Sequence, residues 1–359
     1  MCSSDLDGSG PTTRTDTDKT VDRAFFLISE GEMSKGVALL TSSGLADASD
    51  PRIQQQLRAK HPRRKEELPD TLADVGNFPR VALDLGPTIR NLKSHAGTGV
   101  SGYRNEYLRA LVTDFAEMRA RTVLPLLNAF ASACANADLP GWFYAVVTAV
   151  KAALPIKSPA PAPDAAPDIR PIGVGEVLRR AIHSALVAQH KELLRQHLWP
   201  QQVAIGVPSG MSVLVFGVRF MLEVHPEFVV VRLDLKNAHN EVKRASMVRR
   251  TAAAEHLGAL VPLLWATYCP KSDVHLPIDG GLEKAGFTSD EGAQQGDGLA
   301  SAGFCVTIHP EVCQLDAELV PYGGAARFDM DDGHAMGHPH VVFPAVMRFA
   351  QRLVRAIGP

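Results

Sequence analysis

The sequence predicts an α+β fold, because segments with helical spacing of apolar residues are interspersed with a few short segments of strand character. Helical spacing is clear after Gly102, after Pro125 and over residues 177–194. Strand character, with β-branched residues, is clearest at 228–235. Of the 359 residues, 45% are hydrophobic and 21% charged, as in an ordinary globular protein.

The overall charge and the cysteines narrow the class of protein. The formal net charge is −2, so a basic surface for nucleic acid would have to come from local clusters of charge. Five cysteines without a Cys-x-x-Cys pair argue against a disulfide framework and fit a reducing compartment. No apolar signal region or membrane span is visible, so we expect an intracellular, soluble protein.

The first part of the chain predicts a tail followed by short helices. Residues 1–20 contain little that can be buried, and we expect a disordered tail there. Residues 21–70 predict short helices, broken by Gly31, Gly36 and Gly44, and then a polar linker.

The middle of the chain predicts further helices. The glycine-rich segment 97–102 matches neither the dinucleotide fingerprint nor the phosphate loop, and we expect it to lead into a helix through Met118. Pro125 predicts the start of another helix, which Pro140 closes. An amphipathic helix is expected at 177–194.

A short hairpin with two basic residues is expected before that helix. Residues 149–157 predict a strand that ends at Lys157, and a loop rich in Pro and Ala connects it to Arg170. Lysine and arginine on either side of such a loop can bind a triphosphate, because a guanidinium fork matches phosphate oxygens.

Residues 228–235 have the pattern of a buried central strand, and the strand ends at Asp234. A carboxylate at the end of a buried strand is costly unless it is paired or binds a metal ion, so Asp234 is a functional candidate. Two simpler interpretations remain open: an acid at the wet edge of the strand, or the N-cap of a helix that begins near Lys243.

A hairpin turn is expected at Asp279-Gly280-Gly281. A glycine-rich segment at 291–299 then leads into a helix of small residues at 300–308. Glycines allow a ligand to approach the backbone, and Gln295 offers both a donor and an acceptor there.

Two adjacent carboxylates, Asp331 and Asp332, precede Gly333 on an expected tight turn between strand-like segments. Adjacent acids repel one another, and hard ions such as Mg²⁺ take carboxylate ligands, so the turn is a candidate metal site. A solvated acidic turn is the simpler alternative. His334, His338 and His340 follow without cysteines at zinc-finger spacing, and we expect them in a surface loop.

Four motifs in this order resemble the reverse transcriptase family, of the type found in non-LTR retroelements. Each motif alone is weak, and the order of all four carries the resemblance, which covers roughly residues 95 to 350. The motifs are Arg170-Pro171-Ile172, Asp234-Leu235-Lys236-Asn237-Ala238-His239-Asn240, Gly292-Ala293-Gln294-Gln295-Gly296-Asp297 and Met330-Asp331-Asp332.

The resemblance implies a right-hand polymerase, with fingers and connecting helices at 71–227 and a palm at 228–359 whose antiparallel sheet packs on helices. It implies an RNA-directed DNA polymerase with an RNA template, a DNA primer and deoxynucleoside triphosphates as partners, and residence in the nucleus. Two Mg²⁺ ions, or Mn²⁺, would be held by Asp234, the carbonyl of Leu235 and Asp331, with Asp332 in support, for in-line nucleotidyl transfer.

The resemblance also implies roles around the nucleotide. Lys157 and Arg170 would neutralise the triphosphate, and Gln295 and Gly296 would line the nucleotide and template pocket. His239 stands where the family has an aromatic ring that excludes a 2′-hydroxyl.

The chain departs from the family pattern in several places. Asp329 stands where the family has Tyr or a similar residue, and Gly298 replaces a proline. The sequence ends at Pro359, before the rest of a palm and a thumb, so we expect an incomplete copy. The alternatives are an inactive retroelement remnant that at most binds nucleic acid, and a helical scaffold with incidental acids.

Overall fold

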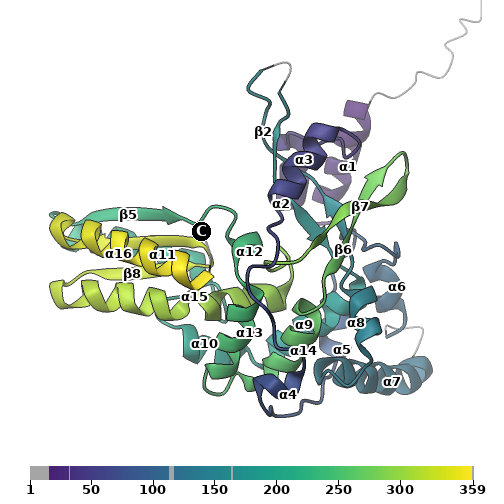
Figure 1. The fold of residues 1–359 in the computed structure, drawn as a ribbon. Coiled ribbons are helices and arrows are strands. Elements are labelled where there is room, and N and C mark those ends of the chain that lie inside the picture. Colours follow the sequence, from purple (N-terminus) through teal and green to yellow (C-terminus); the bar gives the residue numbers. More distant parts are fainter. Residues whose placement is uncertain (1–15, 32, 113–116, 163–164, 358–359) are drawn as a thin grey trace, which may run out of the picture. The chain divides into compact units, whose positions relative to one another are not determined.

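The computed structural model describes residues 16–31, 33–112, 117–162 and 165–357. Helices and short antiparallel or mixed sheets both contribute, so the predicted α+β class is confirmed (Figure 1). The chain divides into two compact units, one formed by 1–53 with 154–170 and the other by 54–153 with 171–359. Fingers and palm remain a prediction.

The first unit consists of short helices and a small hairpin. Of the tail expected at 1–20, residues 1–15 lie outside the described ranges, and α1 begins within the rest. Gly31, with φ +81°, separates α1 from α2, as predicted. Gly36 was expected to break a helix but lies inside α2, because a Cβ there would be 2.5 Å from Ile28 and glycine permits the close approach. The elements are α1 (Asp16–Ser29), α2 (Met33–Thr41), the start of α3 (Pro51–Ala59), β2 (Ile156–Ser158) and β3 (Asp168–Ile169).

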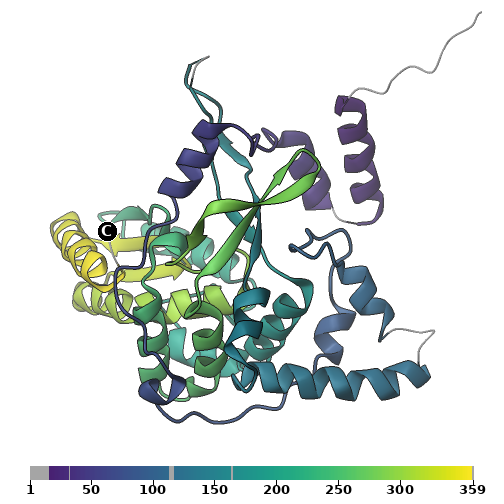
Figure 2. The same cartoon turned by 45° about the vertical axis from the view of Figure 1, so that its right-hand side comes forward.

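The second unit contains a four-stranded sheet of order β4-β1-β6-β7. The predicted hairpin is confirmed, since Asp279 (φ +48°) and Gly280 (φ +76°) form the two-residue loop between β6 and β7. This hairpin forms a long twisted ribbon (Figure 2). The strand predicted at 149–157 is split at Leu154-Pro155 between β1 and β2. The strands are β1 (Val150–Ala153), β4 (Ile172–Val174), β6 (Ser272–Ile278) and β7 (Gly281–Ser289).

A separate antiparallel sheet of three strands has the order β5-β9-β8, with β5 (Val229–Asp234), β8 (Ala325–Asp329) and β9 (Asp332–Gly337). The strand predicted at 228–235 is therefore present, but its predicted central, buried position is wrong. β5 pairs only with β9, and Arg232 and Asp234 on it are exposed. An edge strand leaves alternate side chains in water, which removes the desolvation cost that we attributed to Asp234.

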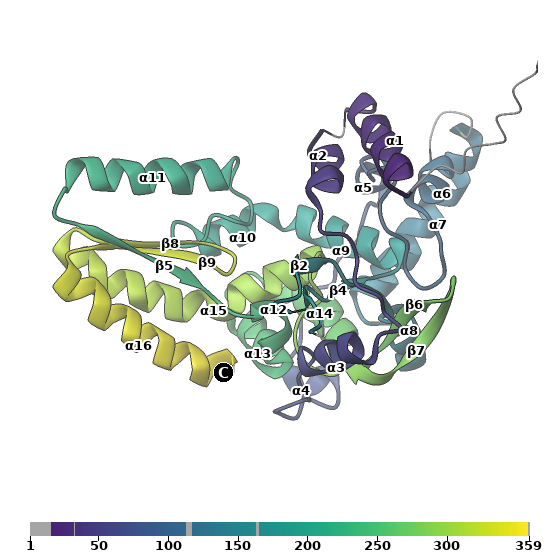
Figure 3. The ribbon, with the colours of Figure 1, turned by 90° about the horizontal axis from the view of Figure 1, so that it is seen from above.

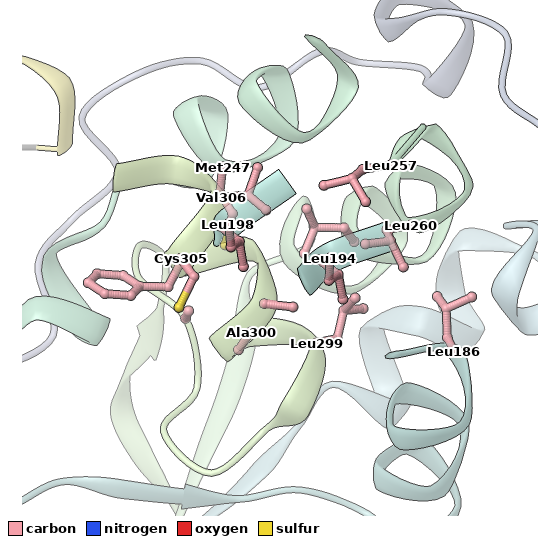
Figure 4. Close-up of a cluster of buried hydrophobic side chains, with 14 of the residues drawn as sticks. Leu186, Leu194, Leu198, Met247, Leu257, Leu260, Leu299, Ala300, Cys305 and Val306 are labelled. Carbon is pink, nitrogen blue, oxygen red and sulfur yellow. The ribbon is translucent and has the colours of Figure 1, made fainter. Parts of the chain in front are cut away.

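This sheet lies between helices. Figure 3 shows α15 (Gly298–Leu319) and α16 (Pro339–Ile357) on one side of it and α11 (Gly210–Val224) on the other. Phe328 of β8 packs against Phe349 of α16, with 5.6 Å between the ring centroids. Most of α15 is buried, and leucines of α9 and α10 surround its first half (Figure 4).

The remaining helices correct two expectations. The helix predicted to run through Met118 ends at Ala110, and residues Glu117–Ala135 form α7. Pro125 lies inside α7 instead of starting a helix, because the apolar residues around it pack on the core and keep the helix continuous. The helices are α4 (Leu72–Val75), α5 (Gly86–Arg90), α6 (Asn105–Ala110), α7 (Glu117–Ala135), α8 (Gly141–Val147), α9 (Val177–Gln189), α10 (Lys191–Leu198), α12 (Ala238–Glu241), α13 (Arg244–Ala253) and α14 (Val261–Tyr268).

Candidate active site

The register of the three-stranded sheet aligns three carboxylates in one row. Asp332 on the central strand β9 is directly opposite Asp234 on β5 and directly opposite Asp329 on β8. Directly opposite residues of antiparallel strands share a face, with Cβ atoms about 5 Å apart. Asp331 belongs to the two-residue loop between β8 and β9, next to this row. The structure therefore brings Asp234, Asp331 and Asp332 to one end of the sheet, as predicted.

The carboxylates in this row repel one another. Burial raises the pKa of Asp329, and the neighbouring charges of Asp332 and Asp331 raise it further. The exposed guanidinium of Arg232 forms an ion pair with the row, since its Nη2 lies 3.6 Å from Asp332 Oδ1. Asp234 is exposed on the edge strand and is not the N-cap of α13, since Lys243 occupies that position. Charge of this kind favours a bound cation.

The donor atoms fit a hard divalent ion, because all are carboxylate or backbone oxygens. In the described part of the chain, no three His, Cys, Asp or Glu side chains converge as a formed metal cluster. The fit therefore rests on donor type and on strand register, which places the acids side by side.

The side chain of Gln202 supports the acidic loop through hydrogen bonds to the backbone of Met330. Its Nε2 donates a hydrogen bond to the carbonyl of Met330 (2.9 Å), and its Oε1 accepts one from the N–H of Met330 (3.1 Å). The sequence does not point to this residue, because nothing in the local pattern at 201–203 links it to a turn so distant in the chain.

His239 lies between the acidic loop and the core. Its ring packs on Phe304, with 4.8 Å between centroids, and burial lowers the pKa of His239, although the charge of Asp331 opposes this. The carbonyl of His239 accepts a hydrogen bond from the N–H of Ala293 at 2.6 Å, which ties α12 to the glycine-rich segment.

Gly292 allows the glycine-rich segment to lie directly against α12. Its φ is +77°, and a Cβ there would be 2.5 Å from the backbone of Asn240. Its N–H donates to the carbonyl of Val242 at 3.0 Å. Close by in sequence, Gln295 is half-buried and Gly296 is exposed. The glycine-rich segment is therefore held against α12, and a nucleotide pocket there remains a prediction.

A buried polar network lies at the end of the glycine-rich segment, where α15 begins. Asp297 caps α15 by accepting from the N–H groups of Leu299 and Ala300, and its Oδ2 lies 2.7 Å from His183 Nδ1. Burial raises the pKa of Asp297, but His183 and other partners outweigh that effect and lower it to about 2. No sequence pattern pointed to this network, because its members come from separate helices.

The two predicted triphosphate ligands lie in the other unit. Lys157 is on β2 and Arg170 directly follows β3, and both side chains are exposed. The N–H of Arg170 donates to the carbonyl of Pro155 at 2.9 Å, so the hairpin is formed. Their approach to the acids remains a prediction.

The three histidines after the acidic turn are not in a surface loop. His334 belongs to β9, and His338 and His340 flank the start of α16. His338 packs on the ring of Phe228 at 4.9 Å and on His340 at 5.4 Å. These contacts form because β9 extends beyond the turn and runs directly into α16.

No family model matches this chain, and no curated protein matches its sequence. None of the helices in the described residues combines the length and the apolar character that a membrane crossing requires.

Proposed function

We propose that this chain is the reverse transcriptase domain of a non-LTR retroelement, an RNA-directed DNA polymerase. The observation that carries the proposal is the register that sets Asp234 opposite Asp332, with Asp331 in the adjoining loop. Two acidic segments that lie far apart in the sequence meet at this point, which an incidental acidic turn does not require.

In this proposal the acids hold the metal ions. Asp234, Asp331 and the carbonyl of Leu235 would bind Mg²⁺ or Mn²⁺, and Asp332 would support them. The bound ions supply charge stabilisation for the attacking and leaving oxygens of an in-line transfer. The partners are an RNA template, a DNA primer and deoxynucleoside triphosphates.

Other residues bind and orient the nucleotide. Gln295 and Gly296 present polar groups beside α12, and His239, packed on Phe304, fills the position beneath the sugar. Lys157 and Arg170 would neutralise the triphosphate.

An inactive remnant that at most binds nucleic acid is the competing proposal. It is favoured by Asp329, an additional acid in the row whose pKa is raised by burial and then by the charges of Asp332 and Asp331, and by the departures from the family pattern. A scaffold with incidental acids predicts no dependence on a metal ion at all.

Primer extension on an RNA template with Mg²⁺ or Mn²⁺ tests these proposals. We expect incorporation by the natural chain and its loss in Asp331→Asn, because the amide is a poor ligand for a hard ion. The control is Asp279→Asn, which makes the same change in the β6–β7 turn.

Each result separates the accounts. Equal incorporation by Asp331→Asn and by the control would contradict the two-metal mechanism. The absence of incorporation in the natural chain and in every variant would support the inactive remnant. Activity that appears only in Asp329→Tyr would identify the additional acid as the lesion.

A further inference from the structure

We propose that Gln202 is a positioning residue of the site: its side-chain amide fixes the Met330-Asp331 loop and thereby directs the Asp331 carboxylate. This inference rests on the proposed function, since it assigns Asp331 a task that depends on its position.

The loop has a conformation that needs support. Met330 has φ +58°, in the left-handed region that residues with a side chain rarely adopt. A two-residue hairpin loop with positive φ at its first position usually has Gly, Asn or Asp there, and a residue such as Met is unusual. The reciprocal hydrogen bonds from Gln202 satisfy both backbone polar groups of Met330 and hold it in this conformation.

Gln202 is itself held firmly. Its side chain is 0% exposed. The N–H of Val203 donates to the carbonyl of Phe328, and the N–H of Phe328 donates to the carbonyl of Gln201, both at 2.8 Å. The segment 201–203 thus pairs with the outer edge of β8, which ends where the loop begins. The backbone pairing of 201–203 with β8 and the buried Gln202 amide together restrain the loop.

Gln202 acts through the backbone of the loop. Both of its side-chain hydrogen bonds to the loop are to Met330, the residue directly before Asp331. Its loss would therefore change the direction of the Asp331 carboxylate while the number and type of ligands stay the same. Polar groups that orient metal ligands in this indirect way have large effects on metal affinity.

Gln201 provides a matched control. Its backbone pairs with β8 as described, but its side chain donates to Asp316 Oδ2 at 2.8 Å, away from the loop. Gln201→Met and Gln202→Met therefore make the same chemical change one residue apart.

The experiment measures Mn²⁺ binding by electron paramagnetic resonance and hydrogen exchange of the Met330 N–H. We expect Gln202→Met to weaken Mn²⁺ binding by about 10-fold and to speed the exchange, with Gln201→Met close to the natural chain. In primer extension, high Mg²⁺ should recover part of the activity lost in Gln202→Met, which a purely structural defect would not allow. If Gln202→Met does not fold, Gln202→Asn replaces it, because its shorter amide cannot span the same gap.

The outcomes separate this inference from the proposed function. Equal Mn²⁺ affinity and equal Met330 exchange in the two Met variants would overturn the inference. Weaker Mn²⁺ binding in Gln202→Met without any incorporation by the natural chain would uphold it and reject polymerase activity. If the natural chain binds no Mn²⁺ through Asp331, the proposed metal site is rejected, and hydrogen exchange of the Met330 N–H tests the role of Gln202 in the loop. Faster exchange in the Gln202 variant but not in the Gln201 variant supports a loop fixed by Gln202. Equal exchange in the two variants rejects it.

Discussion

Burial and the neighbouring carboxylates make the ionised form of Asp329 unfavourable in the folded chain. Its pKa is raised in the folded chain, so the protonated form stabilises the fold below the unfolded pKa of 3.8, and this contribution is lost as the pH rises through the folded pKa. Near neutral pH the ionised group is therefore unfavourable until a cation binds.

Asp329→Asn is accordingly expected to stabilise the metal-free chain by about 0.5 kcal/mol at pH 7, the usual size of a like-charge effect between opposite strand residues. Urea unfolding at pH 7 and at a pH of about 3.5, below the unfolded pKa, measures the difference, which should shrink at the lower pH. A variant that is less stable than the natural chain at pH 7 would contradict this prediction.

Asp297 has the opposite dependence on pH. Its folded pKa of about 2 lies below the ordinary value of 3.8, so its contribution to stability is present above that ordinary value and is lost as the pH falls toward 2. Burial would raise this pKa, but the charge of His183 and its hydrogen bond to the carboxylate outweigh the effect of burial.

Asp297→Asn should destabilise the chain by about 3 kcal/mol at pH 7, because it removes one partner of a buried pair. The helix cap itself is preserved, since Asn is also a good N-cap. Urea unfolding at pH 7 measures the loss, with the exposed Glu67→Gln as control. A loss equal to that of the control would show that the buried pair contributes nothing to stability.

At the scale of elements, the glycine-rich segment and α12 form one packed pair. Gly292 combines a positive φ with a close approach to Asn240, whereas Gly280 in the β6–β7 turn has nearly the same φ and nothing within 4 Å of the place where a Cβ would stand. Substitutions at the two glycines therefore distinguish the cost of backbone strain, which both share, from the cost of steric overlap, which only Gly292 has.

Gly292→Ala is therefore expected to cost about 2 kcal/mol more than Gly280→Ala, because overpacking adds to the strain that both share. Thermal or urea unfolding of the two variants gives the difference. Equal losses would mean that α12 moves aside freely, and that the segment is not held against it.

The elements themselves followed the sequence unevenly. The loop at Asp279-Gly280 was predicted because its turn chemistry is local. Pro125 was wrongly predicted to start a helix, since tertiary packing keeps α7 continuous through it. The strand before Asp234 was predicted, but its place at the edge was not, because the order of strands depends on long-range pairing.

At the scale of the whole molecule, the predicted site residues are distributed over the two compact units. The acids, His239 and the glycine-rich segment belong to the unit 54–153 with 171–359, and Lys157 and Arg170 belong to the other.

The sequence by itself determined the α+β class, the acidic turn and the strand that ends at Asp234, because periodicity and turn chemistry are local properties. Only the tertiary structure decided that Asp332 lies between Asp234 and Asp329, and that Gln202 holds Met330. These contacts join segments distant in the chain, and their register follows from how the whole core packs, which no local pattern encodes.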